Sequence, residues 1–246
     1  MLNIDLLSQS AVEKWNTERE AVITDDLQDH VYPNLFHTQL SGLSLQSINL
    51  YGAQMNGVDL RYSDLTDAYL VKSRLLGTSF AWANLTNAVI CESEILGSAF
   101  HKAKMVGCDL SGLSMRDGDI SQAVLHGSNL CKSIFSDISF AGSSLCGATL
   151  DCAIFSNTAF SETDMTGSSV SGTVFSDVDM RGIVGLDTVK CEKPAEITLS
   201  TFVKSEWQIP EVFLRVCGIA DDVIAYAKSR ASKKPQQPIF PWKTRP

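Results

Sequence analysis

The sequence predicts an all-β solenoid, a rod of short stacked segments, and three observations support this fold class. Every fifth residue from Leu35 to Met180 is a large apolar side chain, thirty positions without a slip. A period of five fits neither a helix nor a strand, but it fits a solenoid. Thirteen of the sixteen glycines lie two residues after such a position. Proline is absent from Asn34 through Lys193, so backbone donors stay available for hydrogen bonds between coils.

Two further phases of the repeat define the coil. The residue two positions before each large side chain is usually small, as are Ala53 and Ser63. Small residues there allow neighbouring layers to pack as densely as a native protein core. The glycine phase indicates a corner, because glycine tolerates a positive φ. We therefore expect an interior of stacked apolar layers and corners rich in glycine.

The repeat resembles the pentapeptide repeat family. Quoted from this chain, it reads Ala83-Asn84-Leu85-Thr86-Asn87 and Ser128-Asn129-Leu130-Cys131-Lys132, and the resemblance covers 31–182. The fold of that family is a right-handed, quadrilateral parallel β-helix with four pentapeptides per coil. The resemblance implies a repeat domain over 31–185 with about 7.5 coils and, at about 4.8 Å per layer, a rod about 36 Å long.

The segment before the repeats, residues 1–30, is predicted to cap the rod, because the end of a stacked β-rod exposes edges and core. Ser10-Ala11-Val12-Glu13 is a capping box, which predicts a helix over about 11–21. Its apolar side chains would lie on the first coil: Val12, Trp15 and Val22.

The segment after the repeats, 186–230, is predicted to cap the other end. We expect 186–205 to be irregular, followed by helices over Glu211–Val216 and Asp221–Ser229 that Gly218 separates at a C′ position. The apolar residues of these helices either cover the rod or form a homodimer contact: Phe213, Leu214, Ile219, Val223 and Ile224. The last segment, 231–246, is basic and proline-rich and predicts a loose tail.

Both flanks also resemble those of certain bacterial pentapeptide proteins. The similar segments are Ala11–Asn16 and Ile209–Ile219. Some relatives of that kind continue into a TIR domain, a signalling or NAD-cleaving module. This chain ends at Pro246 and has no room for such a domain, so the resemblance implies no enzymatic role.

Composition indicates a cytoplasmic protein. No run of eighteen apolar residues exists, which predicts no membrane span, and no secretion signal is present at the start. The seven cysteines lack the spacing of metal ligands, and we interpret them as reduced thiols. Residues 31–180 carry fourteen acids and seven bases, and this net acidity argues against direct nucleic-acid binding by the rod.

Three outward surfaces stand out, because residues twenty apart are expected to stack. The first surface is apolar, and a contiguous apolar patch suggests a contact with a protein partner or packing under a terminal segment. Its residues are Phe36, Tyr62, Leu76, Trp82 and Leu96. A second apolar strip joins Tyr51, Val71, Tyr69 and Val89.

The third surface is an acidic stripe, consisting of Asp117, Asp119, Asp137, Asp177 and Asp179. Like charges stacked in a sheet are destabilising, although water and counterions can screen them. The stripe is either a solvated face, an imitation of a nucleic-acid backbone, or a surface that meets a basic partner.

Motifs for catalysis, metal binding or cofactor binding are missing from the sequence. The four histidines fall in different columns without ligand spacing, and no phosphate-cradling loop or nucleophile elbow is present. The leading hypothesis is therefore a non-enzymatic scaffold that binds through its faces, in a setting of bacterial stress or defence that only the flank resemblance implies. The alternatives are a DNA mimic that binds a type II topoisomerase, as some family members do, and the targeting subunit of a split effector.

Overall fold

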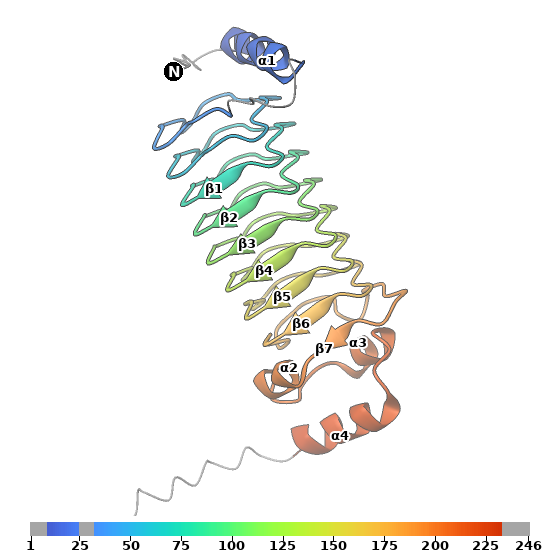
Figure 1. Cartoon of the computed structure of the whole chain (residues 1–246). Coiled ribbons are helices and arrows are strands. Elements are labelled where there is room, and N and C mark those ends of the chain that lie inside the picture. Colours follow the sequence, from blue (N-terminus) through green and yellow to red (C-terminus); the bar gives the residue numbers. More distant parts are fainter. Residues whose placement is uncertain (1–8, 25–31, 233–246) are drawn as a thin grey trace, which may run out of the picture.

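The structure, a computed structural model, describes residues 9–24 and 32–232. Figure 1 shows a rod of stacked coils with a helix at its N-terminal end and short helices at its C-terminal end. The N-terminal helix is α1, Gln9–Thr24. The C-terminal helices are α2, Leu199–Lys204, α3, Glu211–Val216, and α4, Asp221–Ala231. None of the described helices is long and apolar enough to cross a membrane.

One side of the rod is a seven-stranded parallel sheet in chain order. The register advances by twenty residues per coil from Arg74↔Glu94 onward, and by twenty-two at the last step, Val174↔Glu196. The other three sides are joined by isolated parallel bridges such as Gln39↔Asp59. The strands are β1 Arg74–Leu76, β2 Glu94–Leu96, β3 Ser114–Arg116, β4 Ile134–Ser136, β5 Ile154–Ser156, β6 Val174–Ser176 and β7 Glu196–Ile197.

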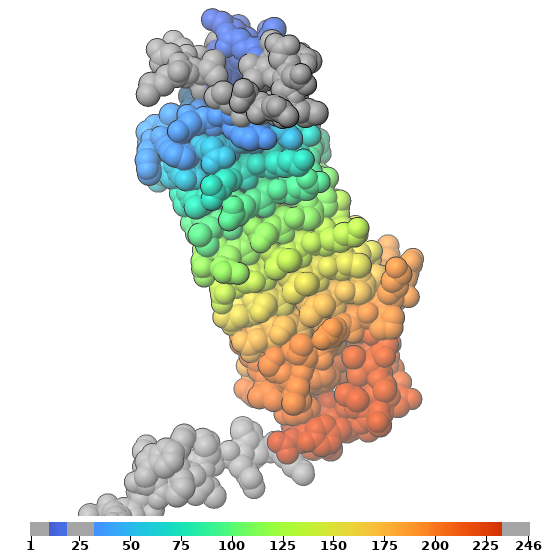
Figure 2. Space-filling model, viewed as in Figure 1, coloured from blue at the N-terminus to red at the C-terminus, as the bar shows by residue number. Residues whose placement is uncertain are grey.

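This architecture confirms the predicted parallel β-helix, with a small difference in the coil count. The named strands span six turns from β1 to β7. The coils before β1 are held only by isolated bridges that begin at Asn34↔Gln54, and the prediction of about 7.5 coils counted these as well. Figure 2 shows the coils as successive closed layers along the rod.

The core is the column of large apolar residues, all of which are buried. In the second half of the rod the column is a ladder of phenylalanines, in which Phe155 stacks on Phe135 at 5.3 Å and on Phe175 at 5.6 Å between ring centroids. Burial of each such side chain stabilises the fold by about 1.5–3 kcal/mol. The small hydroxyl residues beside the column are satisfied by carbonyl groups, as when Ser73 Oγ donates to Leu50 O at 3.0 Å.

The corners confirm the prediction from glycine. All thirteen glycines of the corner phase have positive φ, and so do the other residues in that phase, including Trp82 at +63°. For a side chain other than glycine this conformation costs roughly 1–2 kcal/mol. The coil holds it because the corner N–H binds the next coil, as from Trp82 N to His101 O at 3.0 Å.

At the N-terminal end, α1 covers the first coil through Val12 and Trp15, which are both buried. Trp15 Nε1 donates to Asn49 O at 2.8 Å, and Asn16 Oδ1 accepts from Asn49 N at 2.8 Å. The helix begins at Gln9, so Ser10 lies inside it and the prediction that Ser10 is the N-cap was wrong; sequence signals place helix ends only to within one or two residues. The predicted contact of Val22 lies outside the described side chains.

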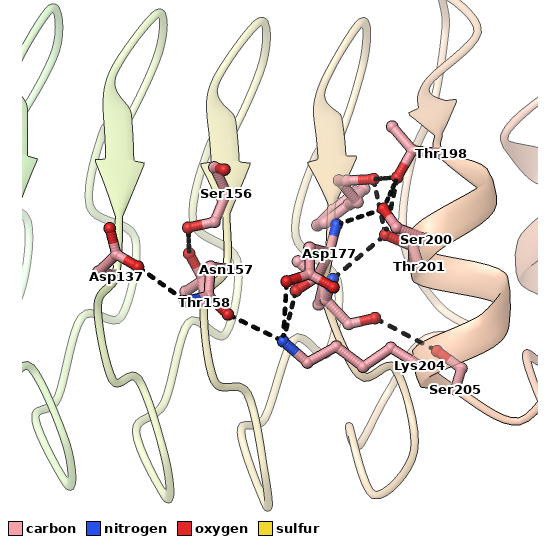
Figure 3. A network of polar contacts seen from close by, with 12 residues as sticks. Asp137, Ser156, Asn157, Thr158, Asp177, Thr198, Ser200, Thr201, Lys204 and Ser205 are labelled. Carbon is pink, nitrogen blue, oxygen red and sulfur yellow. Dashed lines mark hydrogen bonds and ion pairs between the residues drawn. The ribbon is translucent and has the colours of Figure 1, made fainter. Parts of the chain in front are cut away.

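At the C-terminal end, the expectation that 186–205 is irregular was wrong, because β7 and α2 lie within it. β7 extends the ladder beyond β6, and α2 then covers the open edge with hydroxyl groups. Asp177 N donates to Ser200 Oγ at 3.1 Å, Val178 N to Thr201 Oγ1 at 3.2 Å, and Met180 N to Ser205 Oγ at 2.9 Å. Figure 3 shows these side chains pointing from α2 towards the last coil.

Helices α3 and α4 match the two predicted helices closely, apart from two extra residues at the end of α4. Gly218, at φ +78°, ends α3 as predicted. The N–H of Ile219 donates to Leu214 O and that of Gly218 to Arg215 O, each at 3.0 Å. These bonds satisfy the last carbonyls of the helix.

One side of the rod loses its ladder at the last coil. The bridge Ser139↔Ala159 has no successor at Asp179 in the described chain, whereas Asp164↔Val184 continues on the next side. A cavity of about 250 Å³ lies at this interruption, lined by Asn157, Phe160 and Lys204 among others.

Candidate interaction surfaces

Tyr62 and Trp82 form an exposed stack at one corner of the rod. Their ring centroids lie 6.2 Å apart with 19° between the planes, and the side chains are 63% and 49% exposed. Lys102, one coil further along, places Nζ 4.4 Å from the Trp82 ring centroid. His101 meets the same ring edge-on at 6.4 Å. The sequence prediction thus identified the two aromatic residues but missed the cation that covers Trp82.

Leu76 and Leu96 are paired on the neighbouring corner, as predicted from their spacing. Leu96 is exposed and Leu76 is half-buried. These leucines and the aromatic stack flank one side of the rod, and in the coil of Trp82 the outward residues between them are small, Ser79 and Ala81. Phe36 is exposed but separate, since Asn56 occupies the coil between it and Leu76.

The acidic column at the corner of the sheet is partly neutralised within the chain. Asn157 Nδ2 donates to Asp137 Oδ1 at 2.7 Å. Lys204 of α2 donates to Asn157 Oδ1 at 2.9 Å and to the carbonyl of Asp177 at 2.8 Å, and its ammonium lies 3.4 Å from the Asp177 carboxylate (Figure 3). Asp117 and Asp137 are exposed and take part in no ion pair among the described residues.

Asp119 and Asp179 lie on the side of the rod next to this column, and each meets a basic partner. Asp119 Oδ2 is 3.8 Å from His101 Nδ1. Asp179 accepts from Arg181 Nε at 2.9 Å and from Nη2 at 2.7 Å, and these hydrogen bonds hold the pKa of its carboxyl below the usual range. Arg181 also pairs with Glu206. The structure therefore does not bring the five predicted aspartates together as one bare stripe.

The C-terminal helices use most of the predicted residues internally. Phe213, Leu214 and Ile224 are buried within the chain, Ile219 is partly buried against the core, and only Val223 is well exposed. Phe213 packs edge-on against Phe175 at 6.1 Å, so it covers the end of the rod's core. The apolar side chains that these helices do expose were not predicted: Leu199, Val203, Val212, Val216 and Tyr226.

The second apolar strip forms a stack of its own. Tyr51 and Tyr69 lie 6.2 Å apart with nearly parallel rings, and Lys72 places its ammonium 6.0 Å from the Tyr51 ring. Val71, expected on the surface beside them, is buried. As with Trp82, a cation one coil further along the chain covers an aromatic face.

Groups suited to chemistry are sparse in the described residues. No cluster of three or more histidine, cysteine, aspartate or glutamate residues there could hold a metal ion. All seven cysteines are free, and burial raises the pKa of Cys108 to about 12. This thiol is therefore protonated near neutral pH.

The repeat region is similar to known proteins. The family model described as "Pentapeptide repeats" matches eight copies that run from residue 34 to residue 182. No curated protein matches the chain.

Three solved structures that resemble the chain are the following. HetL, a pentapeptide repeat protein involved in heterocyst differentiation regulation from the cyanobacterium Nostoc sp. strain PCC 7120, is 15% identical, with 75% of this chain and 96% of that chain covered and a TM-score of 0.33. QnrB1, a plasmid-mediated fluoroquinolone resistance protein, is 13% identical, with 79% and 94% covered and a TM-score of 0.38. A thylakoid lumen protein of Arabidopsis thaliana is 17% identical, with 47% and 77% covered and a TM-score of 0.26.

Identity and TM-scores this low say nothing about function, so the assignment rests on the repeat itself. The family model covers more than half of the chain, and the coils in that region stack in the twenty-residue register that four pentapeptides produce. The chain therefore belongs to the pentapeptide repeat family.

Proposed function

We propose that this protein is a non-enzymatic, cytoplasmic scaffold that binds a protein partner through the aromatic patch, defined as Tyr62, Leu76, Trp82 and Leu96. The observation that carries the proposal is the pair of large aromatic side chains at left-handed corners. Tyr62 has φ +60° and Trp82 has φ +63°, and both are exposed.

The fold does not require aromatic residues at these corners. Glycine fills thirteen positions of the same phase and adopts this φ without strain. A bulky residue there is disfavoured by roughly 1–2 kcal/mol, and its exposed ring buries little area in return. Every corner of this phase shares the conformation, so the distinguishing feature is the aromatic side chain, and aromatic residues are enriched in protein interfaces.

The same reasoning gives a test. Trp82→Gly relieves the backbone strain while it removes stacking and cation–π contacts worth roughly 0.5–1.5 kcal/mol each. We expect thermal unfolding to change by only a few degrees, whereas the stoichiometric partner captured from extracts of the source organism is lost. Gln122→Gly, two coils along the same column at φ +57°, is the matched control and should keep the partner. Retention of the partner by Trp82→Gly would sink the proposal.

A DNA mimic that binds a type II topoisomerase is the second candidate, and exposed Asp117 and Asp137 are the observation in its favour. It is the weaker candidate, because Lys204 and Arg181 already neutralise Asp177 and Asp179. Recovery of a topoisomerase that is lost with Asp117→Lys and Asp137→Lys, but kept with Trp82→Gly, would favour the mimic. A catalytic domain encoded next to this chain would favour the targeting subunit of a split effector.

The proposal also includes a homodimer through the C-terminal helices, formed by other residues than those predicted from the sequence. Phe213, Leu214 and Ile224 are buried within the chain. A dimer contact would use the exposed stripes of α2 and α3, where Leu199 and Val203, and Val212 and Val216, are each spaced by four residues along one helix face.

A further inference from the structure

The aromatic stack of the patch is covered at one end and open at the other. The column runs Gly42, Tyr62, Trp82, Lys102, because the corner N–H of each residue donates to the coil that carries the next one. Lys102 covers the outer face of Trp82. At the opposite end, Gly42 has no side chain, and a Cβ added there would meet no described atom within 4 Å. In the described chain, the face of Tyr62 that points along the column towards Gly42 therefore meets no side chain from the corner before it.

Cations lie against three aromatic rings in the described chain, of which Trp82 is the exposed one. Lys102 lies 4.4 Å from Trp82, Lys72 lies 6.0 Å from Tyr51, and the guanidinium carbon of Arg230 lies 5.7 Å from Trp207. Such contacts are attractive because the ring face is electron-rich. Among the described residues, no basic side chain occupies the corresponding position over Tyr62.

Arg61, the basic residue nearest in sequence, is already engaged. Its Nε donates to Asp59 Oδ1 at 2.9 Å and its Nη2 to Asp59 Oδ2 at 2.7 Å. This bidentate pair is close to neutral, so it repels another cation only weakly. Residues 31–180 carry seven more acids than bases, and this field favours the approach of a basic partner.

From these contacts we infer that the open face of Tyr62, above Gly42, binds an arginine side chain from a basic segment of the protein partner. The guanidinium stacks on the ring as Lys102 does on Trp82, and arginine is the better match because its planar group also stacks. This inference rests on the proposed function, since it assigns the partner's chemistry at one end of the same patch.

The repeat supplies a blocking variant and a matched control. Gly42→Lys places a lysine one coil before Tyr62, and the corners Lys72, Lys102 and Lys132 show that lysine is accommodated at φ between +56° and +59°. Gly142→Lys adds the same charge to the same column, four coils from Tyr62, where a Cβ meets only Gln122 Cγ at 3.5 Å. The two variants therefore share the added charge and the left-handed corner conformation, and only Gly42→Lys lies one coil from Tyr62.

The experiment is an NMR titration of the full chain with blocked Gly-Arg-Arg-Gly peptide, with Gly-Gln-Gln-Gly as the uncharged probe. We expect the Tyr62 ring protons to shift with the arginine peptide only. Gly42→Lys should weaken this binding about two- to fivefold more than Gly142→Lys does, which corresponds to a cation–π contact at an exposed site. Tyr62→Leu should show the same weakening.

Three results would overturn the inference: unchanged Tyr62 resonances, equal weakening by the two lysine variants, or full binding by Tyr62→Leu. The first would mean that the space is filled in the full chain, and the second that the rod attracts the peptide by net charge alone. These failures are distinguishable from failure of the proposed function, which is decided by partner loss in Trp82→Gly. The arginine site can fail while the partner still depends on Trp82, and the reverse holds as well.

Discussion

The carboxylate of Asp179 illustrates how a single residue is held in the wall of the rod. It accepts from the backbone N–H of Arg181 at 3.0 Å as well as from the guanidinium. Both contacts stabilise the charged form and lower the pKa of the Asp179 carboxyl. Because the side chain is about one-third exposed, salt screens part of this effect.

This contact predicts a dependence of stability on pH. A carboxyl whose pKa is lower in the folded state stabilises the fold above its unfolded pKa of about 3.9, and this contribution is lost as pH falls through the folded pKa. We expect Asp179→Asn to be less stable than the wild type at pH 7 and to lose less of its thermal midpoint between about pH 5 and pH 2. Asp187→Asn, at an exposed site without an ion pair in the described chain, should follow the wild-type curve. Parallel curves for all three proteins would contradict the assignment.

Which residues meet across coils could be predicted wherever the twenty-residue spacing holds. Tyr62 and Trp82, and Leu76 and Leu96, were paired from spacing alone, and the same spacing could have found Lys102 over Trp82. Lys204 could not be found in this way, because it reaches the acidic column from a helix outside the repeat. The ion pair of Arg181 with Glu206 could not be predicted from the spacing either. It depends on the irregular last coil, which carries Arg181, and on the turn after α2, which carries Glu206.

Among the elements, α2 has a role that its short length does not suggest. Its hydroxyl groups accept the N–H groups that the last coil would otherwise offer to a further coil. Thr201 is fully buried, and its hydroxyl also donates to Phe175 O at 2.9 Å. One small helix therefore both covers the core and closes the β edge, an edge that natural sheets must protect.

We predict that Thr201→Val destabilises the C-terminal end of the rod. Valine keeps the shape of threonine but leaves the N–H of Val178 and the carbonyl of Phe175 without this partner, which costs about 1–3 kcal/mol. Hydrogen exchange should show faster exchange of the Val178 amide, whereas Leu85 at mid-rod keeps its protection. Ser200→Ala, at a more exposed contact, is the milder control. Unchanged exchange at Val178 would show that α2 does not close the edge.

The terminal helices were predictable to different degrees for physical reasons. α3 and α4 both carry a local signal in their acidic first turn, and Gly218 follows α3. Such signals act without the rest of the fold. The signals of β7 and α2 are weaker, because β7 has only two residues and α2 is a six-residue helix with no acidic residue in its first turn. Both form because the last coil presents an edge that pairs with them.

At the scale of the whole molecule, each coil contacts only its neighbours, so stability is close to a sum over coils. The fold class followed from the sequence because a five-residue period leaves few alternatives. The binding partner did not follow, because outward positions are free of that constraint and vary from coil to coil.

This additivity predicts the result of removing two whole coils. Deletion of 114–153 joins Leu113 to Ile154 and preserves both the five-residue phase and the twenty-residue columns. We expect a cooperatively folding protein whose rod is shorter by about 9.6 Å, twice the spacing between layers. Circular dichroism and small-angle scattering measure these two properties. Loss of cooperative unfolding would show that the removed coils make long-range contacts that a nearest-neighbour rod lacks.

The interrupted ladder beside Asp179 has a mechanical consequence. Coils joined on all four sides resist separation by shearing or peeling along any of them, but the last coil lacks this bond on one side. A force that pulls on the C-terminus therefore meets its weakest seam there, between the coil of Phe160 and the coil of Asp179. The terminal helices would detach as one block along this seam, and the severed rod would still hold its aromatic patch four coils away from the tear.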